Sequence, residues 1–419
     1  MTMNSPHQDR PQTHGGGGLW AEGSGNRPTP QWDGALPIQP VWERPVRRGP
    51  GVLNALLMIG AALVVVAVAL LLAMMLGPGA LLLCGVLALV PLTICVLGIL
   101  WIDRWDPEPR GALLFAFLWG AGVSVAVTLL LGMWVTDLLG LALATTAPDV
   151  IGPVFQAPLV EEIAKGLGVL ILVYSRRSHF DGPVDGIVYA GAVGAGFAFT
   201  ENILYFGSAV ADSGGLGSLG SLLTVFVMRG LFSPFAHVMF TAALGLVVGI
   251  AAAKGGGRRI IPAFLLGLVP AIAGHMLWNG GLVVLFTDFF VFYFLIQVPL
   301  FGAAVAGVLL LRRAERRLTE HRLGEYAAAG WLTPQEVGML ATAAGRSQGL
   351  DWAGRCGTRP VMRDFIRSAT RLAFTRQRIV SGHHVELNSA VEQKLLWGLT
   401  GTRQHLLAAM HPADIRKRV

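Results

Sequence analysis

The nine residues APLVEEIAK, at positions 157–165, decide how the rest of this sequence is interpreted. They place two carboxylates, Glu161 and Glu162, and one ammonium, Lys165, inside an apolar run that otherwise has the composition of a membrane helix. An ionisable side chain at that depth costs at least a few kcal/mol, so such residues are rare and usually functional. The sequence therefore predicts that polar residues from other segments meet these three within the membrane.

The overall composition is that of a membrane protein. The chain has 419 residues, of which 53% are hydrophobic and 14% charged, whereas a soluble globular protein carries roughly a quarter charged residues. The pI of about 9.8 would suit a nucleic-acid-binding protein, but 18 of the 32 Lys and Arg and only 9 of the 25 Asp and Glu lie from Arg312 onward. The basic excess thus belongs to the C-terminal tail, so no nucleic-acid partner is expected. The three cysteines have no spacing that suggests a zinc cluster or a disulfide framework.

Apolar runs define the predicted organisation of the chain. Residues 1–50 are rich in Gly, Pro, Gln and Asn without any periodicity, which predicts a disordered extension. A membrane span needs about 20 apolar residues, and about eight runs reach that length: 51–76, 80–102, 111–139, 150–174, 184–208, 222–252, 260–286 and 289–311. Gly77–Gly79 suits either a loop or a kink, and run 222–252 is long enough to begin with a surface helix. The predicted fold class is an all-α polytopic membrane protein with a membrane-embedded domain over residues 51–311.

The charges of the connecting segments alternate. Lys and Arg occur before the first run and after the second, fourth, sixth and eighth runs, whereas the other connections, at 77–79, 145–149, 211–221 and 287–288, contain neither. The positive-inside rule then places both termini in the cytoplasm. We expect a multi-pass protein of the cell membrane, surrounded by the lipid bilayer.

Residues 312–419 are expected to form a small, basic, helical cytoplasmic domain. Thr333-Pro334-Gln335-Glu336 is a capping box with proline at the first helical position, which predicts a helix start. Segment 361–380 is a basic amphipathic helix by its periodicity. We expect its basic face to be solvated, to lie against anionic lipid, or to bind a cytoplasmic partner.

Four of the predicted spans carry polar residues at similar depth. With a rise of about 1.5 Å per residue, Glu161 and His237 each lie roughly 16 Å below the outer edge of the membrane, and Glu201 and His275 lie about 24–26 Å from the cytoplasmic edge. In a hydrocarbon core about 30 Å thick, these four groups share the region between the outer half and the midplane. Arg229 lies further out on the sixth span, and we expect it to reach the outer interface or to pair with Asp212, outside the site.

Spacing adds a second constraint on the same residues. Glu161 and Lys165 are four residues apart and share one helix face, and so do His275 and Asn279. Glu162 is rotated by about 100° and points elsewhere. Such a set either ligates a divalent metal or holds and deprotonates a water molecule. Taken singly, His237 or Asn202 would suit interhelical hydrogen bonding, and Glu161 with Lys165 would suit a structural ion pair, but together the residues favour a functional site.

These motifs, in this order on successive spans, resemble the PrsW family of intramembrane proteases, which are distant relatives of the type II CAAX prenyl endopeptidases. The matching residues are Glu161-Glu162-x-x-Lys165, Phe197-x-x-x-Glu201-Asn202, His237 and His275-x-x-x-Asn279. The segment Asp103 to Pro109 also looks like an acidic, proline-rich loop of that family. The resemblance covers about residues 95–311 and implies cleavage of a membrane-anchored protein, such as an anti-sigma factor, on its extracytoplasmic side.

By position, the resemblance implies that Glu161 is the general base that activates water and that Asn279 donates to the oxyanion. The CAAX-type relatives have histidine where this chain has Glu201, and a carboxylate ligates a metal but does not act as a neutral imidazole. Two histidines and up to three glutamates suffice for zinc, yet the same set also serves a glutamate-activated water, so a zinc cofactor is one of two alternatives. The candidate catalytic residues are Glu161, Glu162, Lys165, Glu201 and Asn279, those for metal binding or water orientation are His237, His275 and Glu201, and Asn202 and Phe197 support them.

Three functions compete on these observations. An intramembrane endopeptidase acting on a single-span membrane protein accounts for the motif order and for the polar residues on four spans. A proton-coupled transporter would use the same Glu, His and Lys residues as a relay, but such transporters tend to have repeated halves, and the Glu-Glu-x-x-Lys segment occurs once. A membrane scaffold without activity would need the polar residues only to join helices.

Overall fold

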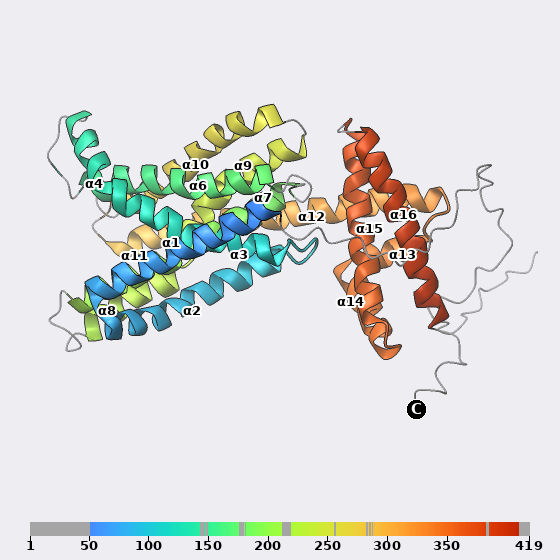
Figure 1. Cartoon of the computed structure of the whole chain (residues 1–419), viewed down its shortest axis with the longest axis horizontal. Helices are drawn as coiled ribbons and strands as arrows, with labels where there is room; N and C mark the ends of the chain where they lie inside the picture. The colour runs from blue at the N-terminus through green and yellow to red at the C-terminus, as the bar shows by residue number, and fades with distance from the viewer. Residues whose placement is uncertain are drawn as a thin grey trace, which may run out of the picture.

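The structure is a computed structural model that describes residues 51–142, 147, 150–175, 180, 182–211, 219–254, 257–281, 284, 286, 288–382 and 385–409. These residues form helices and turns without any strand, which confirms the predicted all-α fold. Figure 1 shows a bundle of long helices joined through α12 to a smaller helical domain.

The first half of the bundle follows the predicted apolar runs closely. Gly77, with φ of 80°, is the single residue between the first two helices, so the Gly-Pro-Gly sequence is a turn between them and not a kink in one helix. Several helices contain π-helical stretches, written η. The elements are α1 (Val52–Leu76), α2 (Pro78–Ile102), α3 (Arg110–Leu118), η1 (Trp119–Ser124), α4 (Val125–Ala142), η2 (Ile151–Gln156), α6 (Ala157–Ser175) and α7 (Pro183–Ala211).

The second half of the bundle is more irregular than the sequence predicted. The run at 222–252 is divided, because its helix stops at Ser233–Phe235 and restarts directly before His237. The last predicted run continues as one helix far beyond residue 311, so the predicted boundary at Arg312 falls inside α12. The elements are α8 (Leu219–Val225), η3 (Phe226–Phe232), α9 (Ala236–Ala253), the 3₁₀ turn η4 (Gly257–Arg259), α10 (Ile260–Gly280), α11 (Phe289–Phe292), η6 (Tyr293–Gln297) and α12 (Val298–Ala328).

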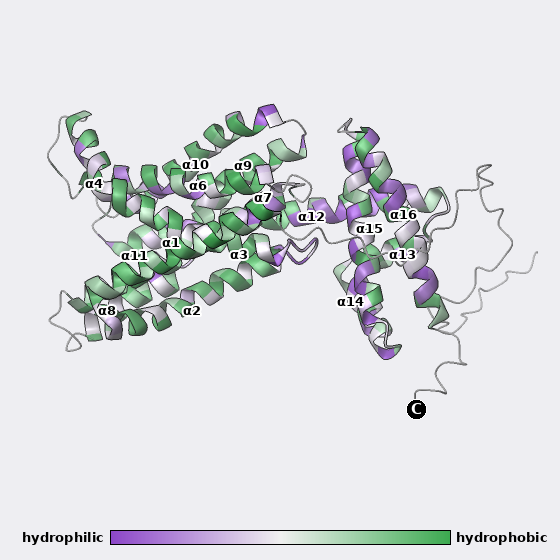
Figure 2. Cartoon of the chain, in the orientation of Figure 1, coloured by the Kyte–Doolittle hydropathy of each residue, from purple (hydrophilic) through white to green (hydrophobic). Residues whose placement is uncertain are grey.

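Seven helical segments of the described chain are long and apolar enough to cross a membrane. They match seven of the eight predicted runs. The remaining run forms η2 and α6, which pack in the bundle but carry Glu161, Glu162 and Lys165. Hydrophobic residues predominate along the helices of the bundle (Figure 2). Large apolar side chains such as Leu53, Leu82 and Leu130 are exposed, and lipid chains would cover them. The chain is a multi-pass membrane protein.

The helix α7 lies at the centre of the bundle and holds the neighbouring helices close. In its most apolar stretch 83% of the residues are buried, against 17% for α1. A Cβ atom added at Gly194 would lie 2.7 Å from the carbonyl oxygen of His237, and one added at Gly196 would lie 2.1 Å from that of Phe117. Only glycine permits such close backbone contacts. Gly194 and Gly196 therefore allow α7 to pack closely against α9 and α3.

The smaller domain is built on the C-terminal half of α12. It contains α13 (Pro334–Leu340), α14 (Ala343–Arg355), α15 (Arg359–Val380) and α16 (Val385–Ala408). The predicted capping box is present, because the Thr333 side chain accepts from the backbone of Glu336 and the Glu336 side chain accepts from that of Thr333. The apolar face of α15, with Met362, Phe365 and Leu372, forms the core of this domain, so the amphipathic pattern reflects internal packing.

Candidate active site

Four helices bring the predicted charged residues into direct contact inside the bundle. The helix α6 supplies Glu161, Glu162 and Lys165, and α7, α9 and α10 supply Glu201, His237 and His275. Five of these six residues are buried, and the side chain of Glu201 is 14% exposed. The four helices therefore place these residues at one level of the bundle, where their side chains contact one another.

Lys165 is the centre of this group, and none of its side chain is exposed. Its Nζ donates to Glu162 Oε1 at 2.7 Å and to Glu161 Oε2 at 3.3 Å. The same nitrogen lies 3.1 Å from His237 Nδ1 and 4.0 Å from the centre of the Phe197 ring. An ammonium has three donors, and all three find acceptors here, so Lys165 holds both glutamates and one histidine in a fixed arrangement.

The two adjacent glutamates have different surroundings. Glu162 is completely buried, and its Oε1 contacts both Lys165 and His275 Nδ1, the latter at 3.0 Å. Its Oε2 lies 3.1 Å from the hydroxyl of Thr241. Among the described residues, Glu161 accepts a hydrogen bond only from Lys165, and its side chain is 6% exposed. Glu162 is thus committed to neighbouring side chains, whereas Glu161 keeps lone pairs for another group.

Each histidine of the site is oriented by a carboxylate. His237 Nε2 lies 2.6 Å from Glu201 Oε2, and because Lys165 donates to Nδ1, we assign the ring proton to Nε2. His275 Nδ1 faces Glu162, and its ring stacks on that of Phe240 at 5.2 Å and 16°. The two imidazoles are 5.0 Å apart and nearly perpendicular. His275 therefore has its Nε2 left to serve a ligand or water.

Arg229 belongs to this network, which corrects the expectation that it lies outside the site. Its Nη2 donates to Glu201 Oε2 at 2.7 Å, and its guanidinium lies 3.6 Å from the centre of the Tyr205 ring. The predicted alternative partner, Asp212, is outside the described residues. A carboxylate within the bundle is costly unless it is paired, and Arg229 in the π-helical η3 neutralises Glu201.

The remaining predicted residues lie around this network. Phe197 is buried, and its ring is 5.2 Å from that of His237. Asn202, which follows Glu201 in the sequence, is buried. Asn279 is half-buried, and its Nδ2 donates to the carbonyl oxygen of Pro153 in η2 at 2.9 Å. An amide nitrogen carries two hydrogens, so Asn279 has one donor beyond the bond that joins α10 to η2.

Two residues that contact the predicted site were not predicted to belong to it: Thr241 was not considered, and Arg229 was expected outside it. Thr241 lies four residues after His237 on the same face of α9, and its hydroxyl is within hydrogen-bonding distance of Glu162 and of the His237 carbonyl oxygen. That spacing was a usable signal. Arg229 gave no comparable signal, because its partner is on another helix.

One carboxylate and two imidazoles form a candidate metal site. Ligand atoms of Glu161, His237 and His275 all lie within 4.8 Å of one another, and all three residues are buried. Catalytic zinc sites use three protein ligands of these types, and histidine ligands usually donate their second nitrogen to a carboxylate, as Glu201 and Glu162 allow here. The donor set fits a divalent metal, although Lys165 now contacts the Nδ1 of His237.

Together the fold and the site define a multi-pass, all-α membrane protein with a carboxylate, histidine and lysine centre buried between its helices. The family model described as "PrsW family intramembrane metalloprotease" matches residues 108–332, which is just over half of the chain. The chain belongs to the PrsW family.

Curated relatives agree with this assignment. The chain is 34% identical over 166 residues to "Protease PrsW" of Clostridioides difficile, an alignment that covers 39% of this chain and 63% of that protein. It is 29% identical over 173 residues to "Protease PrsW" of Geobacillus kaustophilus, covering 40% of this chain and 68% of that one. The chain thus spans less than two thirds of the C. difficile relative. No solved structure matches it.

Proposed function

We propose that this chain is an intramembrane endopeptidase that hydrolyses a peptide bond of a membrane-anchored protein near the extracytoplasmic face. The observation that carries the proposal is the contact network around Lys165, which holds Glu161 beside two oriented histidines within a bundle of membrane helices. The names of the relatives support the same reaction class. A single-span protein such as an anti-sigma factor is the substrate that we infer.

Glu161 is the general base in this mechanism. It is the glutamate with unused lone pairs, and His237 Nδ1 lies 3.9 Å from its Oε2. Lys165 at 3.3 Å favours the ionised carboxylate that a base requires. A water between Glu161 and His275 Nε2 would lose its proton to Glu161 as its oxygen attacks the scissile carbonyl carbon. Glu161 then returns that proton to the leaving amine.

Glu162, Glu201 and Arg229 position the reacting groups in this proposal. Glu162 fixes the ring of His275, and Glu201 fixes that of His237, with Arg229 neutralising the charge of Glu201. We assign the free donor of Asn279 to the developing oxyanion, because Asn279 lies one helical turn from His275 and its other donor is held by Pro153.

If zinc is the cofactor, Glu161, His237 and His275 would hold it. A bound divalent metal lowers the pKa of its water and polarises a carbonyl group. His237 would then offer to the metal the Nδ1 that Lys165 contacts in this structure. Metal analysis of the purified protein, beside cleavage before and after chelation, separates this alternative from a water activated by Glu161 alone.

The decisive experiment is cleavage of candidate single-span proteins by the purified, reconstituted chain. We expect Glu161→Gln and His275→Ala each to lower the cleavage rate by roughly two to four orders of magnitude, while Glu320→Gln, which changes an exposed glutamate of α12, leaves the rate unchanged. Wild-type rates in both site variants would refute the assignment. Proton-coupled uptake into liposomes that is lost in Glu162→Gln would instead identify a transporter.

We also propose that the protein lies in the cell membrane with both termini in the cytoplasm. The turn between α9 and α10, which carries Lys254 and Arg259, lies at the same end of the bundle as the helical domain, since residues of both line one cavity. That end is the one rich in Lys and Arg, as the positive-inside rule requires of a cytoplasmic face. The helical domain would then be cytoplasmic.

A further inference from the structure

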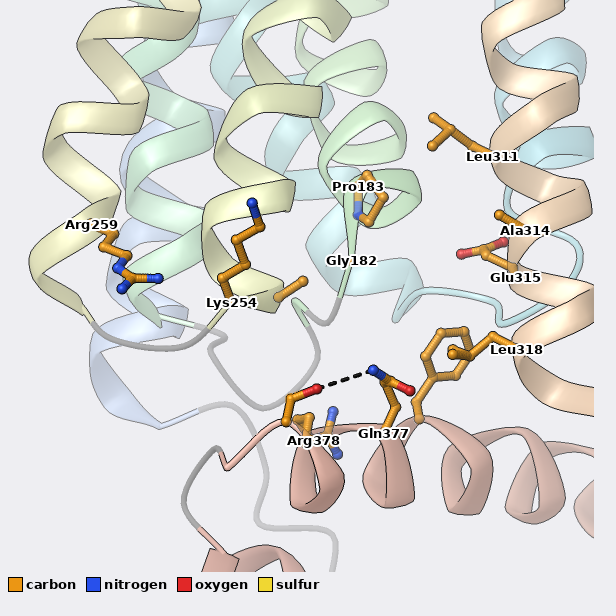
Figure 3. Close-up of a pocket in the computed structure, with 13 residues that line it drawn as sticks. Gly182, Pro183, Lys254, Arg259, Leu311, Ala314, Glu315, Leu318, Gln377 and Arg378 are labelled. Atoms are coloured by element: carbon orange, nitrogen blue, oxygen red, sulfur yellow. Dashed lines mark hydrogen bonds between the residues drawn. The ribbon is translucent and has the colours of Figure 1, made fainter. Parts of the chain in front are cut away.

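A cavity of about 520 Å³ lies between the bundle and the helical domain. Figure 3 shows its boundaries: the start of α7 and the turn between α9 and α10 on one side, α12 on the other, and the C-terminal end of α15 below. The volume is in the range of cavities that hold small ligands. It lies at the end of the bundle that carries Lys254 and Arg259, and it shares no lining residue with the candidate active site.

The polar lining of this cavity is mainly cationic. Lys254 and Arg259 come from the bundle, and Arg378 comes from α15. Both Lys254 and Arg259 are exposed. Arg378 is held in place, because its Nε donates to Asn388 Oδ1 at 3.2 Å and its Nη2 donates to Thr375 Oγ1 at 3.0 Å. One described carboxylate, that of Glu315 on α12, also lines the cavity, so its charged lining consists of three cations and one acid.

The wall formed by α12 and α15 also carries apolar residues, beside Glu315, Gln377 and Arg378. Leu311, Leu318 and Phe374 line it, and Leu311 is continuous with the lipid-exposed surface of α12, where Leu310 is 62% exposed. The cavity therefore joins a cationic region to a surface that lipid chains cover. A small soluble anion needs only the first feature, whereas a phospholipid uses both.

We propose that this cavity binds the phosphate headgroup of an anionic membrane phospholipid, with Lys254, Arg259 and Arg378 around the headgroup and the acyl chains along α12. Basic pockets between membrane helices and the cytoplasmic surface are suited to such headgroups. The bound lipid would connect the bundle to α15. The proposal does not depend on the proposed peptidase activity, because it concerns a separate cavity and is tested by binding.

The test is lipid binding to the full chain in detergent, measured by native mass spectrometry and by thermal stabilisation. The probes are short-chain phosphatidylglycerol, the zwitterionic phosphatidylcholine and inorganic phosphate. The variant is Lys254→Ala with Arg259→Ala, and the matched control is Arg258→Ala with Arg313→Ala, which removes two exposed cations that do not line the cavity. All four positions are exposed, so folding is retained.

We expect phosphatidylglycerol to bind the wild type and the control equally, and to bind the cavity variant more weakly by roughly fivefold for each cation removed. Phosphatidylcholine and inorganic phosphate should bind weakly to all three proteins. Equal affinities of the cavity variant and the control would overturn the site. Stabilisation by inorganic phosphate as strong as that by phosphatidylglycerol would overturn the lipid assignment and identify a soluble phosphate compound as the ligand.

Discussion

The ion pair between Arg229 and Glu201 provides a direct test of how the site is assembled. Replacing Arg229 with methionine preserves most of the side-chain volume but leaves the Glu201 carboxylate with only the neutral His237 as a described side-chain partner. The side chains of Arg229 and Glu201 are 30% and 14% exposed. This burial lies between that of surface pairs, worth about 0–1 kcal/mol, and that of fully buried pairs, whose disruption costs about 3–5 kcal/mol.

We therefore expect Arg229→Met to lower the free energy of unfolding by about 2 kcal/mol. Adding Glu201→Gln removes the unpaired charge, so the double variant should recover about half of that loss. The measurement is thermal or denaturant unfolding in detergent for the complete double-mutant cycle. Arg258→Met, at an exposed cation of η4, serves as the control and should change stability by less than about 0.5 kcal/mol.

The result that would refute this reasoning is a double-mutant cycle without coupling. If Arg229→Met is as stable as Arg258→Met and Glu201→Gln adds no interaction energy, Arg229 does not neutralise Glu201 in the bundle. The original expectation from the sequence, with Arg229 at the outer interface, would then be correct.

Three further predictions concern other parts of the bundle. Thr241→Val should lower the unfolding free energy by about 1–3 kcal/mol, because Glu162 loses a hydroxyl neighbour, and chemical unfolding against wild type measures this. Burial raises the pKa of the Asp103 carboxyl from 3.8 to about 7, so the folded state holds an extra proton between those pH values and loses stability as pH rises through them. The free energy of unfolding of Asp103→Asn should therefore rise relative to that of wild type from pH 4 to pH 7, by a few kcal/mol at most, and the difference between the two proteins should be constant above pH 8. Unfolding experiments at several pH values measure this difference. A difference that does not change with pH would show that the carboxyl is already ionised at pH 4. Gly196→Ala should strongly reduce the yield of folded protein in size-exclusion chromatography, because its Cβ would overlap a backbone carbonyl, whereas Gly191→Ala, whose Cβ would be 3.4 Å from a side chain, should fold normally.

Most of the membrane topology could be predicted from the sequence, because long apolar runs and the charges between them depend only on local composition. The helix α1, for example, begins and ends within one residue of the predicted run. The separate directions of Glu161 and Glu162 also follow from helical geometry alone. In the structure Glu162 contacts Thr241 and His275, as a residue rotated away from Glu161 would.

The sequence was less informative where a side chain depends on another helix. The depth of Arg229 was estimated for a regular helix, but η3 is π-helical and the chain breaks at Ser233 before α9 begins. The choice between Asp212 and Glu201 as its partner is a tertiary property that no local pattern encodes. Similarly, the amphipathic period of α15 predicted an apolar face but not which helices cover it.

The helix α12 has a mechanical consequence for the helical domain. It runs unbroken for 31 residues, or about 46 Å, so the last span and the first helix of the domain are one stiff rod. A second attachment is formed by Trp105 in the loop after α2, which donates to Thr319 of α12 and is covered by the guanidinium of Arg346 from α14. The helical domain is thus attached to the bundle at two places, through α12 and through Trp105. A force applied to the domain would therefore act on the final span through α12 and on the loop after α2 through Trp105.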